Sequence, residues 1–139
     1  MKTISSFALL LLCVMALFGQ GVASQAKAEV DASAVVGDWH GTSLCLVKPS
    51  ACHDEEALYH VRQNASGKLS MQADKIVDGQ AQMMGTLDCT YRAGENLLRC
   101  DLGRGYVELT LKGDRLEGAM FLPDKTRWRD IKLRKESPK

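Results

Sequence analysis

A chain of 139 residues is long enough for one domain, and its 45% hydrophobic content is enough to build a buried core. The 18 basic and 17 acidic residues nearly cancel, which excludes the strong basic field that favours nucleic acid or an anionic membrane surface.

The N-terminal residues have the layout of an export signal. A run of 12 apolar residues, Phe7–Phe18, follows Lys2 and precedes a stretch of small residues. The run is too short to span a bilayer comfortably, so we expect a signal peptide over residues 1–26, with cleavage after Ser24 or Ala28 as alternatives. No later segment approaches 18 apolar residues. We therefore expect an exported chain, periplasmic or extracellular, with no membrane span.

The cysteine count supports the same compartment. Cys13 follows a leucine inside the apolar run, so we assign it to the leader and not to a lipid anchor. Four cysteines remain, namely Cys45, Cys52, Cys89 and Cys100. An even number in an oxidising compartment predicts two disulfides, and three pairings are possible. The local pairing closes loops of about 8 and 12 residues, each stabilising by roughly 2.5–3 kcal/mol in the chain-entropy estimate.

The mature chain begins with residues 27–36, where we expect a short helical turn capped by Asp31 or Ser33. Short runs of period two then follow, separated by turn residues, and Asp78-Gly79 is a strong hairpin signal. The pattern predicts eight strands, over 37–47, 57–63, 68–77, 81–91, 96–102, 106–112, 115–122 and 126–134.

No helical pattern of 10–15 residues separates these runs, so we do not expect parallel βαβ units. Short turns between sequential strands favour an all-β fold, an eight-stranded antiparallel up-and-down β-barrel over residues 37–134 with a tail at 135–139. An open β-sandwich is the alternative.

The first predicted strand opens with Gly37-Asp38-Trp39. This GxW start resembles the first strand of lipocalins and related calycin barrels, in which an arginine of the last strand packs over the tryptophan at the closed end. The resemblance implies a barrel-closing pair between Trp39 and Arg129, with Arg127 as the next choice. A stacked guanidinium is worth about 0.5–2 kcal/mol.

The chain also resembles a group of small secreted bacterial proteins that share a GxWxGTSxC pattern, then CHDE, then a tyrosine. That resemblance covers nearly the whole domain and implies no particular activity. This chain is much shorter than typical lipocalins, and a barrel of eight short strands is readily filled by its own side chains.

The stretch from Cys45 to His60 gathers the side chains that carry chemistry. Its acids and histidines suit a metal, but the sequence contains no HExxH, no CxxC and no EF-hand loop, and exported cysteines are oxidised. It also lacks GxSxG. We therefore expect no metal, no cofactor and no catalysis. The alternatives are a charged disulfide staple or a partner-binding loop carrying His53, Asp54, Glu55 and Glu56.

Two binding functions remain open. The lipocalin resemblance implies a small apolar ligand inside the barrel, and six residues are candidate lining, namely Tyr59, Met71, Met83, Tyr106, Met120 and Phe121. The alternative is a protein inhibitor or interaction module, in which the Cys45–Cys52 loop meets a basic target. In either case we expect a monomer.

Overall fold

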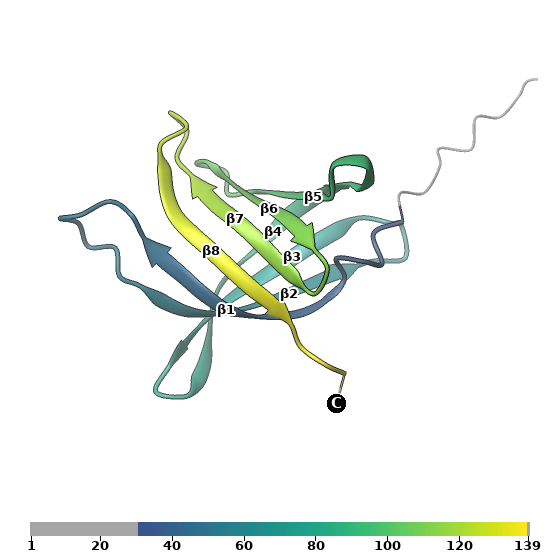
Figure 1. Ribbon diagram of the computed structural model, residues 1–139, viewed down its shortest axis with the longest axis horizontal. Helices are drawn as coiled ribbons and strands as arrows, with labels where there is room; N and C mark the ends of the chain where they lie inside the picture. The colour runs from purple at the N-terminus through teal and green to yellow at the C-terminus, as the bar shows by residue number, and fades with distance from the viewer. Residues whose placement is uncertain (1–30, 139) are drawn as a thin grey trace, which may run out of the picture.

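The computed structural model describes residues 31–138 and confirms the predicted fold class, an all-β antiparallel barrel that is closed by eight strands in chain order (Figure 1). The predicted signal peptide, residues 1–26, lies outside the described residues. The strands are β1 (Gly37–Cys45), β2 (Glu55–Gln63), β3 (Leu69–Val77), β4 (Gln80–Arg92), β5 (Leu97–Asp101), β6 (Tyr106–Lys112), β7 (Arg115–Phe121) and β8 (Arg127–Lys135). A single 3-10 turn, η1 (Ala93–Glu95), interrupts them between β4 and β5.

The core follows from the alternation of side chains along each strand. Successive residues of a strand point to opposite faces, so every second apolar residue enters the barrel. The largest fully buried side chains include one from every strand except β4, namely Trp39, Tyr59, Met71, Leu98, Leu109, Leu116 and Ile131. Each such burial contributes about 1.5–3 kcal/mol.

The Asp78-Gly79 hairpin forms as predicted. Val77 pairs with Gln80, so the turn has two residues, and both adopt positive φ, 51° at Asp78 and 76° at Gly79. Two consecutive positive φ values match the right-handed twist of the flanking strands, which is why Asp-Gly is favoured here.

Both disulfides form in the local pairing. Cys45 bonds to Cys52 across the β1–β2 loop, with 5.9 Å between their Cα atoms. Cys89 bonds to Cys100 directly across the β4–β5 ladder, with 4.1 Å between their Cα atoms.

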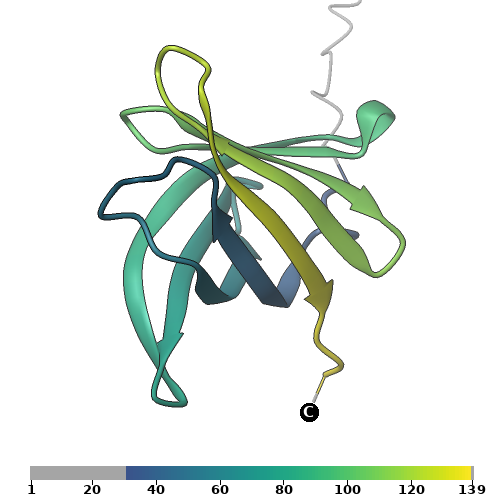
Figure 2. The same ribbon diagram turned by 60° about the vertical axis from the view of Figure 1, so that its left-hand side comes forward.

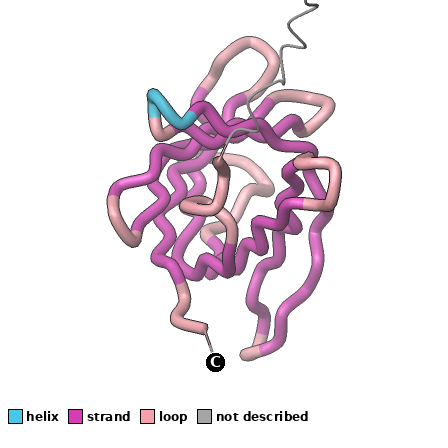
Figure 3. The backbone as a smooth tube through the Cα atoms, turned by 90° about the vertical axis from the view of Figure 1, so that its right-hand side faces the viewer, coloured by secondary structure: helices cyan, strands magenta, loops and turns pink. Residues whose placement is uncertain are grey.

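The N-terminal turn covers one end of the barrel, which we call the closed end. Val35 and Val36 donate backbone hydrogen bonds to the Ala32 carbonyl, and the Asp31 carboxylate accepts one from the Ser33 amide. Ala32 and Val35 are fully buried, so this single turn plugs the ring of strands. Figure 3 shows the ring as seen from this side.

The predicted Trp39–Arg129 pair is wrong. Trp39 lies opposite Lys135 in the β1–β8 ladder, whereas Arg129 lies opposite Cys45, at the other end of the same two strands. The Lys135 ammonium lies 5.3 Å from the Trp39 ring centroid, and the indole N–H donates to the Val35 carbonyl at 2.9 Å. Lys135 has the same strand parity as Arg129 and lies nearer the strand end, so it occupies the expected position of the cation.

The opposite end of the barrel, which we call the open end, carries the longest loop and the longest hairpin. Because the strands run up and down, the loops 46–54, 78–79, 102–105 and 122–126 all lie at this end. Figure 1 shows the 46–54 loop and the β3–β4 hairpin projecting from the barrel there. Among residues 31–138, no helix has the length and apolar character needed to span a bilayer.

Candidate functional site

The 46–54 loop is fixed at its base by its disulfide and by a short internal network. The Ser50 hydroxyl donates to the Val47 carbonyl at 2.6 Å and accepts from the Cys52 amide at 3.2 Å. The Asp54 carboxylate accepts a hydrogen bond from the Cys45 amide at 2.8 Å. The backbone of this exposed loop is therefore held by contacts at both ends.

Arg129 provides the strongest of these contacts. Its side chain is only 9% exposed and enters the open end of the barrel from β8. The guanidinium donates to the Ser43 carbonyl at 3.0 Å and to the Ser43 hydroxyl at 3.2 Å. It also donates to the His53 carbonyl at 2.8 Å and pairs with the Glu55 carboxylate at 3.1 Å. One cation thus joins β8, β1 and the C-terminal end of the loop.

The four predicted partner-loop residues take different positions. Glu55 is half-buried on Arg129, and Asp54 is engaged by the Cys45 amide. His53 is exposed, and its carbonyl is the group that Arg129 binds. Glu56 is exposed and lies 2.7 Å from His40 Nε2. Of these four residues, only His53 and Glu56 therefore have side chains that do not help to hold the loop in place.

A hollow of about 540 Å³ lies beside the base of the loop, on the outer face of β1 and β2. Its lining residues are His40, Gly41, Thr42, Leu44, Asp54, Glu55 and Glu56. Asp54 and Glu56 give it a negative character, since Glu55 is neutralised by Arg129, and Leu44, 41% exposed, adds an apolar edge. Gly41 is required at its floor, because a Cβ there would lie 2.0 Å from the Lys132 carbonyl oxygen of β8.

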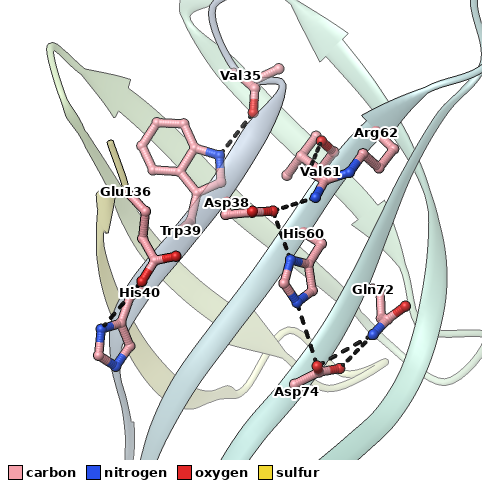
Figure 4. Close-up of polar contacts among 10 residues, drawn as sticks. All are labelled: Val35, Asp38, Trp39, His40, His60, Val61, Arg62, Gln72, Asp74 and Glu136. Carbon is pink, nitrogen blue, oxygen red and sulfur yellow. Dashed lines mark hydrogen bonds and ion pairs between the residues drawn. The ribbon is translucent and has the colours of Figure 1, made fainter. Parts of the chain in front are cut away.

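A second polar cluster, which sequence reasoning missed, lies on the outer face of β1, β2 and β3 (Figure 4). His60 lies between two carboxylates, with Nδ1 at 2.7 Å from Asp38 and Nε2 at 3.5 Å from Asp74. Arg62 also donates to Asp38, and the Gln72 amide donates to both oxygens of Asp74, at 3.0 and 3.3 Å. The hydrogen bond from His60 holds the pKa of Asp38 below its ordinary value.

The carboxylates of this cluster are already paired with other residues of the same cluster. Asp74 is buried, and each of its oxygens has a partner, so the carboxylate does not face an open site. Its signal in the sequence is weak, because Asp38, His60 and Asp74 come from three strands and meet only through the strand register. We assign the cluster to stabilisation of the β1–β2–β3 face.

The six predicted ligand-lining residues do not line one interior cavity. Tyr59 and Met71 are fully buried in the packed core, and burial raises the pKa of the Tyr59 hydroxyl, an effect that the Ser43 hydroxyl partly offsets. Met83 is 67% exposed outside the barrel. Tyr106 pairs with Phe121, and the neighbouring inward residues are Val107 and Met120, so both rings lie on the outer face.

Those two rings form part of an outer surface instead. Tyr106 stacks on Phe121 with 5.0 Å between ring centroids, and the Arg99 guanidinium lies 3.7 Å from the Tyr106 centroid. A hollow of about 480 Å³ lies next to them, between Lys68, Asp88 and Arg99. Lys68 pairs with Asp88 at 3.0 Å, and Arg99 pairs with Glu108. Lys68 and Arg99, the two cations that line this hollow, are therefore already paired with acids.

Within residues 31–138, no group of three or more His, Cys, Asp or Glu side chains is placed to hold a metal ion. Comparison of the chain with family models, with characterised proteins and with solved structures finds no match. The candidate site therefore rests on geometry alone: a constrained loop, a tie from Arg129 and an acidic hollow at their side.

Proposed function

We propose that this protein is an exported, non-catalytic binding module that recognises a basic protein through the 46–54 loop and the acidic hollow beside it. The observation that carries the proposal is the Arg129 tie, which fixes an exposed loop from inside the barrel. A loop that is already ordered loses little conformational entropy on binding, so its contacts contribute more fully to affinity.

The surface chemistry supports a protein partner. Leu46 is 45% exposed and Leu44 is 41% exposed, so the loop base presents apolar side chains next to acids. A small apolar anchor with a charged rim is the common anatomy of protein interfaces. The acids supply attraction to a basic surface, which raises the association rate and makes it sensitive to salt.

The test is site-specific photo-crosslinking in the native source. A photoreactive residue replaces Ala51 at the exposed tip of the loop, and the matched control places it at Glu95, which is exposed on η1 at the closed end. We expect a discrete covalent adduct with a basic protein from the loop position alone. No loop-specific adduct, or the same adducts from both positions, would rule the proposal out.

The contribution of the acids is tested on the purified complex. Glu56→Gln removes one acid of the hollow and leaves the Arg129 and Cys45 contacts intact, whereas changes at Asp54 or Glu55 would disturb the loop itself. We expect Glu56→Gln to lower the association rate and its salt dependence. Glu95→Gln, an equal charge change at the other end, should leave both unchanged.

A small apolar ligand is the second candidate, and one observation favours it. Four apolar residues at the open end are packed against the core but only partly buried, namely Ala73, Leu87, Leu102 and Met120. Such a ring offers an apolar surface above the packed core, on which a small apolar ligand can bind. Titration with a fluorescent fatty acid tests it: saturable binding that Met120→Gln weakens and Glu56→Gln does not would support this candidate over the loop.

A further inference from the structure

Strand β4 extends far beyond its neighbour in the barrel. Its 13 residues run from Gln80 to Arg92, but β5 pairs only with the five residues Asp88–Arg92. Of the other eight residues, 80–87, all but Met84 pair with β3 on one side. Within residues 31–138, no strand pairs with their other side, and this is the longest one-sided strand segment there.

An unpaired strand edge presents backbone N–H and C=O groups that another strand can bind. Natural proteins usually block such edges with charged side chains, proline or a β-bulge. The segment Gln80–Leu87 contains no charged residue and no proline, although 25% of the residues in the chain are charged, and its one bulge, at Met84, leaves Gln80–Met83 in regular pairing with β3. Its β3–β4 hairpin also projects clear of the other strands, as Figure 2 shows.

Two large apolar side chains on this segment are exposed. Met83 is 67% exposed and Met84 is 46% exposed, and both fractions exceed those of the exposed Leu44 and Leu46. Met84 is the extra residue of a β-bulge, since Ala73 pairs with Gly85 and Asp74 with Met83. Methionine is flexible and polarisable, so it adapts to a partner surface.

We propose that the free edge of β4, residues 80–87, is a self-association surface at which two copies of this chain pair their β4 strands antiparallel about a twofold axis near Met83. A twofold axis places each residue near residues of the same segment in the other copy. A charged edge would then meet its own charge, whereas this neutral edge has no such repulsion. The proposed dimer differs from the monomer that we expect from the sequence.

The test is the mass of the purified mature protein, with both disulfides formed, measured by light scattering over a range of concentrations. We expect the mass to rise from one chain to two as concentration increases. Met83→Lys should weaken the association by about tenfold or more, because the axis sets the two lysines close together and methionine contact is lost. Thr90→Lys adds the same charge to β4 where β5 already pairs with it, and should leave the association unchanged.

Hydrogen exchange supplies an independent readout. Amides of residues 80–87 that face away from β3 should become protected as the dimer forms, and those of Thr90–Arg92 should not change. Far-ultraviolet circular dichroism confirms that each variant is folded, which the exposure of Met83 favours. A monomer at all concentrations, binding by an added extended peptide only, or a dimer that survives Met83→Lys would each overturn the proposal.

Discussion

Replacing Arg129 with methionine tests the tie that holds the loop. Methionine keeps much of the apolar stem but removes four hydrogen bonds, and it leaves the Glu55 carboxylate, 20% exposed, without its cation. Removing one partner of a fully buried ion pair costs about 3–5 kcal/mol. Because water reaches Glu55 in part, we expect the lower end, about 3 kcal/mol of unfolding free energy.

The measurement is equilibrium unfolding in urea with both disulfides intact, which reports the midpoint and the slope separately. A double variant, Arg129→Met with Glu55→Gln, removes the orphaned charge and should recover about 1–2 kcal/mol, since a neutral amide is less costly to bury than a carboxylate. Arg127→Met is the matched control on the same strand. Its exposed ion pair with Asp130 should change the free energy by less than about 1 kcal/mol.

Two results would refute this reasoning. If Arg129→Met loses no more stability than Arg127→Met, then the buried guanidinium is not a structural tie. If the double variant is no more stable than Arg129→Met, then the cost does not come from an unpaired Glu55. Either outcome would also weaken the proposed function, which needs an ordered loop.

Three further predictions concern titration and the second disulfide. The lowered pKa of Asp38 stabilises the fold at pH values above the ordinary 3.8, and this contribution is lost as the pH falls below it. Between about pH 4 and pH 2, the urea midpoint of Asp38→Asn should therefore fall less steeply with pH than that of the unchanged protein. An equally steep fall in both proteins would contradict the His60 contact. The raised pKa of Tyr59 opposes ionisation in the fold, so stability is complete below the ordinary 10.0 and is lost as the pH rises above it. Tyr59→Phe should therefore move alkaline unfolding, followed by circular dichroism, to higher pH, and an unmoved transition would argue against this residue. Replacing Cys89 and Cys100 with alanine should cost about 3 kcal/mol in urea unfolding, and a loss near zero would show that their bond does not restrict the unfolded chain.

The fold was predictable because its signals are local. Period-two runs, the Asp78-Gly79 turn and the spacing of Cys89 from Cys100 each act over a dozen residues or fewer. The structure confirms the strand pattern and the hairpin, although β1 ends at Cys45 and not at Val47, and it selects the local one of the three disulfide pairings that the sequence left open. The predicted helical turn before the barrel is a single hydrogen-bonded turn at residues 32–36.

The cross-barrel contacts were not predictable in the same way. Which residue of β8 lies opposite Trp39 depends on the stagger of the closed barrel, and that stagger accumulates over every turn and bulge. Two bulges, at Met84 and at Trp128, shift the register by one residue each. Strand parity therefore identified Arg129 as inward-facing, but it did not show that Lys135 is the residue beside Trp39.

The candidate site shows the same limit. The sequence identified the loop and its acids, but not that Glu55 is held by Arg129, 74 residues away. It likewise grouped Tyr106 and Phe121 with the interior, because an apolar ring on an outer face has no local mark that separates it from a core residue. Long-range pairing decides such cases, and only the three-dimensional register supplies it.

The two proposed surfaces share the open end of the barrel, and this makes them separable by experiment. Pairing of two β4 edges would place two 46–54 loops in one particle, so a partner with two binding sites would meet a bivalent protein. Bivalency raises the overall affinity through effective concentration without any new contact. Met83→Lys should then keep the affinity of a single loop for its partner and lose only the bivalent gain, whereas Glu56→Gln should weaken the single-loop affinity and leave the dimer intact. Loss of both properties in either variant would mean that the loop and the β4 edge are one surface.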